Sequence, residues 1–441
     1  MRKNLIQYRW VTTCVVFGLL SQASLSIATA QTTNSGSSQL EFALILTRHG
    51  VRSPTGKTDK LNQYSAQPWP QWSVPPGYLT PRGGQLMTLF GTYYRQYFAQ
   101  DRLLQPDGCA DAASVTFLAD SDQRTVATGN SLAAGMFPNC QVTVHALPRG
   151  THDPLFHSLG AGVGRPDHAL AAAALSGRIG DNPAGLADAY ASTLKDMEKI
   201  LSECSSPEPC AQPSQSLLEM PSSITLGKGG HLVDFQGPLK TSSTIAENFL
   251  LEYTNGMPLN EVGWGHVNAA TSNEMISLHT ADTDLLQRTP YLARAQASNL
   301  MDRILDTLQQ AIEKKKVKGA LGSPDDKVVF LVGHDSNITT VAGMLGISWM
   351  VDGRRNDTPP GGALVFEVWS SPGASGDTVR TYYVSQTLEQ MRNMIPLTLN
   401  APPVRANTFV SGCSAADRNY SCEFSSFQKT VKAAIDPAFV Q

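Results

Sequence analysis

Residues 48–54, Arg-His-Gly-Val-Arg-Ser-Pro, place an imidazole between two guanidiniums immediately after an apolar run. Arginine offers paired N–H donors that match the oxygens of a phosphate group. The imidazole of His49 is a nucleophile of the kind that forms covalent intermediates. Gly50 has no side chain, so the backbone can approach another group closely there. The segment predicts phosphate chemistry, with Arg48 and Arg52 holding an anion beside His49.

Two further apolar runs lead to residues of the same kind. The run at 114–119 leads to Arg124, and the run at 327–333 leads to His334 and Asp335. In an open α/β sheet, ligands bind in the crevice at the carboxyl ends of the strands. Three strand ends that present arginine, histidine and aspartate therefore favour one anion pocket over three unrelated surface turns.

The charges of these residues suggest a reaction. Arg48, Arg52 and Arg124 would neutralise a phosphate monoester dianion and the charge that develops on its oxygens. His49 would attack phosphorus to give a phosphohistidine, which water then hydrolyses. An alkoxide leaves poorly without a proton, and Asp335 is the candidate donor because an adjacent phosphate anion favours its protonated form.

Three other kinds of protein compete with this interpretation. A metallohydrolase could use His49, His334 and Asp335 as ligands, but three nearby guanidiniums would repel a divalent cation, so we expect no metal and no cofactor. A serine hydrolase is disfavoured because G-x-S-x-G is absent from the sequence. A phosphate-binding protein without turnover would gain nothing from Asp335, which would repel the anion when ionised.

Nearly continuous apolar runs separated by long helical stretches indicate strands that are covered on both faces, and hence an α/β layered fold. The stretch at 165–279 is rich in alanine, serine and leucine, and we expect it to form a mainly helical insertion. The expected strands include residues 41–47, 114–119, 327–333, 363–369 and 380–384.

Helix starts are marked by capping residues. Thr80 and Thr289 each precede a proline, which is favoured at the first helical position. Thr244 and Glu247 have the spacing of a capping box, which predicts that a helix begins there. Asn255 followed by glycine predicts where that helix ends.

The chain has 441 residues and a formal net charge of −3, which disfavours a nucleic-acid-binding protein because such proteins use clustered basic residues. Residues 1–30 combine basic residues, a short apolar run and an Ala-x-Ala site, and so predict a secretory signal peptide. We expect residues 31–39 to be disordered. The mature protein should be periplasmic or secreted, without a membrane segment.

Cysteine content agrees with export, since disulfides form in oxidising compartments. Once a signal peptide is removed, six cysteines are left, which allow fifteen pairings. Sequential pairing is the simplest, because two of the three bridges would then close short loops. The absence of C-x-x-C pairs argues against a zinc site. The six cysteines are Cys109, Cys140, Cys204, Cys210, Cys413 and Cys422.

Residues 48–54 resemble the R-H-G-x-R-x-P signature of the histidine acid phosphatases, and His334-Asp335 resembles the H-D dipeptide of that family. The chain is similar, from about residue 39 to its end, to the periplasmic phytases of bacteria within the family. Further similar segments, in order, are LTPRGG at 79–84, DQRT at 122–125, GWG at 263–265, LQRTP at 286–290 and DTPPGG at 357–362.

The resemblance implies a central mixed sheet flanked by helices, with a smaller α-helical domain inserted. The phosphatase domain would comprise residues 40–164 and 280–441, and the α domain residues 165–279 with a contribution from about 58–78. Carried over by position from the family, the nucleophile is His49 and the proton donor is Asp335. The residues that would hold the transferred phosphate are Arg48, Arg52, Arg124 and His334. Those that would contact the rest of the substrate are Thr55, Lys57, Glu261 and Arg288.

Two departures concern the substrate. Gly56 is inserted relative to the Pro-Thr-Lys pattern of the phytases, and Ser336 gives H-D-S-N, as in the related glucose-1-phosphatases, where phytases have H-D-T-N. The implied activity is hydrolysis of phytate (myo-inositol hexakisphosphate) and other phosphate monoesters by a monomer. The alternatives are a glucose-1-phosphatase or broad sugar-phosphate phosphatase, and, from another class, a non-catalytic phosphate-ester-binding protein.

Overall fold

The computed structural model describes residues 38–56, 58–204, 210–371 and 376–441. The predicted signal peptide at 1–30 lies outside these residues, as do residues 31–37 of the segment predicted to be disordered. The predicted disorder is wrong for Gln39, which begins β1 and pairs with Ser370.

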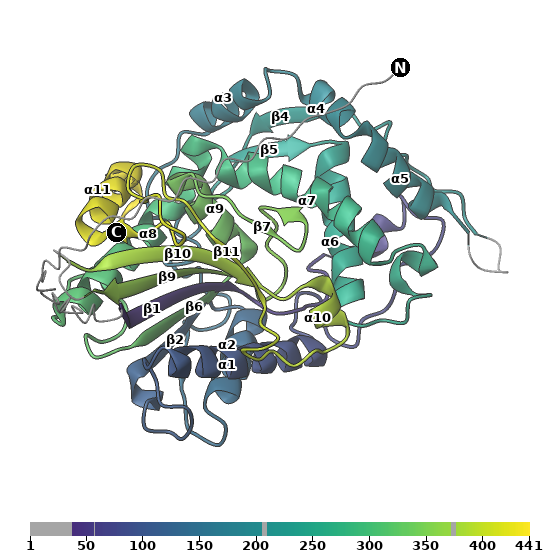
Figure 1. Cartoon of the computed structure of the whole chain (residues 1–441). Coiled ribbons are helices and arrows are strands. Elements are labelled where there is room, and N and C mark those ends of the chain that lie inside the picture. Colours follow the sequence, from purple (N-terminus) through teal and green to yellow (C-terminus); the bar gives the residue numbers. More distant parts are fainter. Residues whose placement is uncertain (1–37, 57, 205–209, 372–375) are drawn as a thin grey trace, which may run out of the picture. The chain divides into compact units, whose positions relative to one another are not determined.

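A mixed sheet of eight strands forms the centre of the described part of the chain (Figure 1). Its order is β11-β10-β9-β1-β6-β2-β3, and β12 pairs with β10. The neighbours β1, β6, β2 and β3 are parallel, whereas β9, β10 and β11 continue the sheet from β1 in antiparallel fashion. The predicted fold class is confirmed. The strands are β1 (Gln39–Arg48), β2 (Val115–Ala119), β3 (Val144–His145), β6 (Val328–Gly333), β9 (Ala363–Ser370), β10 (Thr378–Ser385), β11 (Val404–Asn407) and β12 (Cys422–Glu423).

Both faces of the sheet are covered by helices, which explains why its strands read as continuous apolar runs. Alternate residues of β1 point to opposite faces: Ala43 and Ile45 belong to one core, and Leu44 and Leu46 to another. Figure 1 shows α1 and α2 on one side of the sheet and α8, α9 and α11 on the other. These helices are α1 (Pro81–Gln100), α2 (Gln123–Met136), α8 (Pro290–Glu313), α9 (Asp335–Leu345) and α11 (Phe424–Ala434).

A separate core lies among helices from the middle of the chain. Tyr64 and Trp69, from the segment expected to contribute, are buried in it, and so are Leu388 and Met391 from α10. The predicted boundary at 279 falls inside α7, so the division into two domains stays a prediction. The helices near this core are α3 (His168–Arg178), α4 (Pro183–Ala189), α5 (Ala191–Ser202), α6 (Pro238–Thr254), α7 (Ala269–Arg288) and α10 (Leu388–Arg392).

Short elements complete the described chain. Two hairpins are formed by β4 (Ser223–Leu226) with β5 (Val233–Gln236) and by β7 (Met350–Val351) with β8 (Arg354–Arg355). The 3-10 helices are η1 (Thr58–Leu61), η2 (Ala112–Ser114), η3 (Val262–Gly265) and η4 (Pro437–Phe439).

One predicted helix start is wrong. Helix α6 begins at Pro238, so Thr244 and Glu247 lie inside it rather than at its end. Proline at the first turn supplies the start signal, and the capping-box spacing is coincidental. The predicted end is correct, because α6 stops at Thr254 and Gly256 takes a φ of 71°.

The other two predicted starts are confirmed. The hydroxyl of Thr80 accepts from the backbone N–H of Gly83, which satisfies a free donor of α1. Thr289 precedes α8 as expected, but its hydroxyl donates to the carbonyl of Leu285 instead of capping the helix.

Sequential disulfide pairing is confirmed. The bridges join Cys109 to Cys140, Cys204 to Cys210, and Cys413 to Cys422. Within the described ranges, every helix is too short or too polar to cross a bilayer.

Candidate active site

Three neighbouring parallel strands bring the predicted residues to one edge of the sheet. The backbone N–H of His49 donates to Gly333, and that of Asp120 donates to Val332, so β1, β6 and β2 end side by side. Arg48 is the last residue of β1, and His334 follows β6 directly. The convergence expected from the sequence is therefore observed.

His49 is almost completely buried and has a defined tautomer. Its Nδ1 lies 2.9 Å from the carbonyl oxygen of Gly50. Since a carbonyl only accepts, Nδ1 carries the proton and Nε2 keeps a free lone pair. Burial lowers the pKa of His49 well below its usual 6.5, and the charges of Arg48 and Arg52 lower it further. The imidazole thus resists protonation below pH 6.5, and its nucleophilic atom is Nε2.

A partly buried carboxylate holds the first two arginines. Glu247, on α6, accepts from Nη2 of Arg48 and from Nη2 of Arg52, the latter at 3.1 Å. The other terminal nitrogen of Arg48 donates to the carbonyl of Thr358. Burial alone would raise the pKa of Glu247, but the two arginines hold it well below its usual value. The carboxylate is therefore ionised, and it fixes both guanidiniums beside His49.

On the other side of His49, Arg124 and His334 lie next to each other. Nη2 of Arg124 is 2.6 Å from a carboxylate oxygen of Asp122 and 3.4 Å from Nδ1 of His334. Nε2 of His334 is 2.6 Å from Oδ2 of Asp120. The rings of His49 and His334 meet edge to face, with centroids 5.6 Å apart. Burial lowers the pKa of His334, although Asp120 opposes that shift.

Asp335 is the first residue of α9. Its Oδ1 accepts from the backbone N–H of Ser336 at 2.7 Å, and its Oδ2 lies 3.3 Å from Nη2 of Arg48. Burial is the largest single influence and raises its pKa, but nearby positive charges, chiefly Arg48 with a smaller effect of Arg52, together lower the pKa below the usual 3.8. Protein charges alone therefore keep this carboxyl ionised, so its use as an acid requires a bound anion that offsets Arg48.

Close packing against α1 holds the signature loop in place. A Cβ on Gly50 would lie 2.8 Å from Cγ of Met87 and 3.0 Å from the carbonyl oxygen of Gly83. The hydroxyl of Thr80 donates to the carbonyl of Val51. The missing side chain of Gly50 thus allows the loop to pack closely against α1. The close backbone approach expected from the sequence is therefore an approach to this helix.

Residues expected to contact the rest of the substrate are less closely grouped. Thr55 is exposed. Its methyl carbon and Nη1 of Arg124 both lie 3.6 Å from the position that a Cβ on Gly77 would take, which places Thr55 near Arg124. Lys57 lies outside the described residues. Glu261 is exposed and lines a cavity with Asn260, Trp264 and residues 67, 68, 70 and 71, and none of the six catalytic and phosphate-binding candidates lines that cavity.

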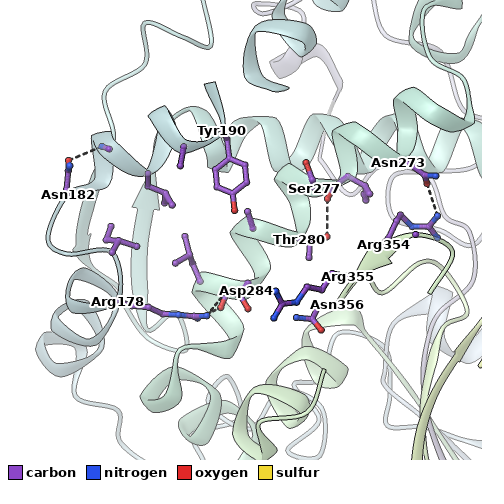
Figure 2. Close-up of a pocket in the computed structure, with 18 residues that line it drawn as sticks. Arg178, Asn182, Tyr190, Asn273, Ser277, Thr280, Asp284, Arg354, Arg355 and Asn356 are labelled. Carbon is purple, nitrogen blue, oxygen red and sulfur yellow. Dashed lines mark hydrogen bonds and ion pairs between the residues drawn. The ribbon is translucent and has the colours of Figure 1, made fainter. Parts of the chain in front are cut away.

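The contacts of Arg288 are with residues other than the six catalytic and phosphate-binding candidates. Its Nη2 donates to the carbonyl of Ile347, and its Nε lies 3.2 Å from Asp284. Asp284 also lines a cavity of about 810 Å³ among α4, α7 and β8, shown in Figure 2. Neither His49 nor any predicted phosphate ligand lines that cavity. The structure therefore brings the six catalytic and phosphate-binding candidates together, whereas the contacts described for Arg288 and Glu261 are with other residues, and their roles toward the substrate stay predictions.

Sequence reasoning missed three side chains that shape the site. Glu247 was interpreted as a capping residue, and its partners Arg48 and Arg52 lie 199 and 195 positions away, so no local signal could reveal it. His279 lies close to Glu247 and Asp335. Asp120 directly follows β2, and that position was the one signal that could have indicated its role.

Comparisons with known proteins agree with this geometry. The model of the histidine phosphatase superfamily (branch 2) matches residues 39–385. The phytase AppA of Escherichia coli is 35% identical over 91% of this chain and 93% of that protein, and a glucose-1-phosphatase of Salmonella typhimurium is 31% identical over 93% and 95%. The structure of Hafnia alvei phytase in complex with tartrate matches with a TM-score of 0.84 and 36% identity, over 92% of this chain and 99% of that one. The chain belongs to branch 2 of the histidine phosphatase superfamily.

Proposed function

We propose that this phosphoric monoester hydrolase acts on phytate and other organic phosphate monoesters through a phosphohistidine on His49, with Asp335 as the proton donor. One observation carries the proposal: a buried, neutral imidazole has its Nε2 free, and arginines from two strand ends surround it. A protein that only bound phosphate would need the arginines but not a nucleophile of fixed tautomer.

Phosphate binding precedes the chemistry. Arg48, Arg52 and Arg124 donate to the oxygens of the transferred group, and His334 completes its surroundings. Glu247 already orients two of the guanidiniums, so little rotamer entropy is lost when the substrate binds. The same donors stabilise the charge that develops on the equatorial oxygens in the transition state.

Transfer then occurs in two steps. Nε2 of His49 forms a bond to phosphorus while the bond from phosphorus to the ester oxygen breaks, and Asp335 gives its proton to that oxygen. The bound dianion offsets Arg48 and so favours the protonated carboxyl before attack. In the second step water attacks phosphorus, the P–N bond breaks, and ionised Asp335 accepts the proton from water. The products are the alcohol and inorganic phosphate.

Phytate is the substrate that the relatives favour. AppA and the Hafnia alvei protein are both named phytases, and the latter also has a structure with myo-inositol hexakis sulphate. A glucose-1-phosphatase or broad sugar-phosphate phosphatase is the second candidate, supported by two related glucose-1-phosphatases and by Ser336 in the H-D-S-N segment.

The place of action and the partners belong to the same proposal. Three disulfides suit an oxidising compartment, which supports a periplasmic or secreted protein. We also propose a monomer without a nucleic-acid partner, which is consistent with the formal net charge of −3.

Substrate preference is tested by measuring kcat/KM for phytate, glucose 1-phosphate and an aryl phosphate at acid pH. The proposal predicts the highest value for phytate. A higher value for glucose 1-phosphate would favour the second candidate, and no turnover of any ester would leave only a binding protein.

The role of Asp335 is tested with Asp335→Asn. Loss of the acid should lower kcat by about 10²–10⁴-fold for sugar phosphates, which have poor leaving groups. An aryl phosphate has a good leaving group and should lose far less. Equal losses on both kinds of ester would remove the role of Asp335 as the acid.

A further inference from the structure

Two imidazoles share one carboxylate oxygen behind the phosphate site. Nε2 of His157 lies 2.8 Å from Oδ2 of Asp120, and Nε2 of His334 lies 2.6 Å from the same atom. A carboxylate oxygen of Asp122 is 3.7 Å from Nε2 of His334. We call these four side chains the Asp120 cluster, and one ligand atom from each lies within 4.8 Å of all the others.

These donors have the types and spacing of a transition-metal site. Zinc binds imidazole nitrogen and carboxylate oxygen at about 2.0–2.2 Å, so two donors of a tetrahedral site lie roughly 3.3 Å apart. The separations of 2.6, 2.8 and 3.7 Å in the Asp120 cluster bracket that value. Two imidazoles with two carboxylates suit zinc, cobalt, nickel or copper better than magnesium or calcium.

The charges of the Asp120 cluster also favour the binding of a cation. The Asp120 cluster contains two carboxylates, and the only cation bonded to it among the described residues is Arg124, which is 2.6 Å from Asp122. Oδ2 of Asp120 lies 2.8 Å from Nε2 of His157 and 2.6 Å from Nε2 of His334, so this carboxylate oxygen is the point at which both imidazoles meet. The repulsion that disfavours a metal at His49, beside Arg48 and Arg52, is thus weaker at the Asp120 cluster.

An ion can reach the cluster from solvent. The side chain of His157 is 39% exposed, and it lines a cavity of about 210 Å³. His152, His231 and Ser336 also line this cavity but lie outside the Asp120 cluster. His334, by contrast, is buried and lies 3.4 Å from Arg124 of the phosphate site, so the Asp120 cluster has one imidazole at the cavity and the other beside that site.

We propose that Asp120, Asp122, His157 and His334 bind one divalent transition-metal ion of the Zn²⁺ type. Each imidazole would ligate through Nε2 and keep one proton on Nδ1, and any second proton would be released to solvent. Nδ1 of His334 now accepts from Nη2 of Arg124 at 3.4 Å, so Arg124 must move away from that nitrogen when the ion binds. The ion takes the place of the hydrogens that now bridge to Asp120. It is no part of the hydrolytic mechanism, and because His334 belongs to the phosphate site under the proposed function, its binding inhibits phosphate release.

The test is direct titration of chelator-treated protein, carrying no polyhistidine tag, with Zn²⁺ by calorimetry and with Co²⁺ by visible absorption. The wild type should bind one ion with the spectrum of a four- or five-coordinate Co²⁺ site. His157→Asn replaces one imidazole of the cluster by a shorter amide, which is a poor ligand, and it should weaken binding at least about tenfold. His231→Asn, in the same cavity, is the matched control and should bind as the wild type does.

Absence of a one-to-one site in the wild type, or equal affinity in His157→Asn and the wild type, would overturn the proposal. Unfolding temperatures measured without metal establish that each variant is folded. Zn²⁺ inhibition of phosphate release from an aryl ester is measured separately and should weaken in parallel with affinity in His157→Asn. Binding at the cluster without any inhibition would support the metal site and count against the role of His334 in the proposed function.

Discussion

At the scale of single residues, the chemistry of the site depends on groups that hold the reactive ones in one state. The carbonyl of Gly50 fixes the tautomer of His49, and burial together with the arginines keeps the ring neutral. Glu247 restrains Arg48 and Arg52 while it removes part of their positive charge. The nucleophile and its phosphate ligands are therefore arranged before any substrate binds.

Glu247→Gln tests the effect of the negative charge of Glu247 on Arg48, Arg52 and Asp335. Loss of the carboxylate leaves Arg48 and Arg52 less neutralised, so inorganic phosphate should inhibit at a concentration at least about threefold lower. The groups facing Asp335 include Arg48, Arg52, Glu247 and His279, and among them only Glu247 raises the pKa of Asp335. Its removal lowers that pKa, so the high-pH limb of kcat, which reports deprotonation of the acid in the substrate complex, should shift down by about one pH unit.

Glu252→Gln is the matched control for that change. Glu252 lies on the same helix, is buried, and accepts from the backbone N–H of Gly263. Burial raises its pKa to about 8, so it is already neutral at acid pH, and the substitution removes no charge there. Phosphate inhibition and the pH profile should match the wild type. Similar shifts in both variants would show that they reflect a loosened α6 rather than a lost charge.

At the scale of secondary-structure elements, the site depends on how closely α1 approaches the loop after β1. A Cβ on Gly83 would lie 2.2 Å from the carbonyl oxygen of Val51, which is closer than a Cβ atom approaches a non-bonded atom in proteins. A Cβ on Gly84, one position on, would have Oγ of Ser131 as its nearest neighbour at 3.3 Å. The two adjacent glycines thus differ in what they permit.

Gly83→Ala should displace the loop after β1, which carries His49 and Arg52. We expect a cost of about 1–3 kcal/mol in the free energy of unfolding, from overpacking. We also expect kcat/KM to fall by about 10²-fold, since misplacement near 1 Å is enough for such a loss. Gly84→Ala is the control and should stay close to the wild type in both measurements. Unchanged activity in Gly83→Ala would show that the loop does not depend on this contact.

Much of this arrangement could be predicted from the sequence, because its signals are local. The apolar runs predicted β1, β2, β6, β9 and β10, and the convergence of Arg48, Arg124 and His334 followed from the rule for parallel strand ends. The start of α6 was mispredicted because a threonine and a glutamate can take capping-box spacing by chance. The role of Glu247 required tertiary contacts across almost two hundred positions, and no local pattern encodes those.

At the scale of the whole molecule, three disulfides restrain loops outside the site. Cys109 and Cys140 are 31 positions apart, whereas Cys204 and Cys210 are only 6 apart. Cross-links that close longer loops remove more entropy from the unfolded chain. The first bridge should therefore contribute more to stability than the second.

Paired cysteine-to-serine variants test this order. Removing Cys109–Cys140 should cost about 4 kcal/mol in the free energy of unfolding, and removing Cys204–Cys210 about 2 kcal/mol. Urea unfolding monitored by circular dichroism measures both values. The reverse order would mean that strain or residual structure in the unfolded chain, rather than loop length, decides the contribution of each bridge.

The central claim is that His49 becomes covalently phosphorylated during turnover. The most direct measurement is to mix the enzyme with excess substrate, quench in alkaline denaturant during the steady state, and locate phosphate on peptides by mass spectrometry. We predict phosphate on the peptide that contains His49, and none in His49→Ala, whose kcat should fall at least about 10³-fold. Turnover without phosphate on His49, or near wild-type activity in His49→Ala, would contradict the account.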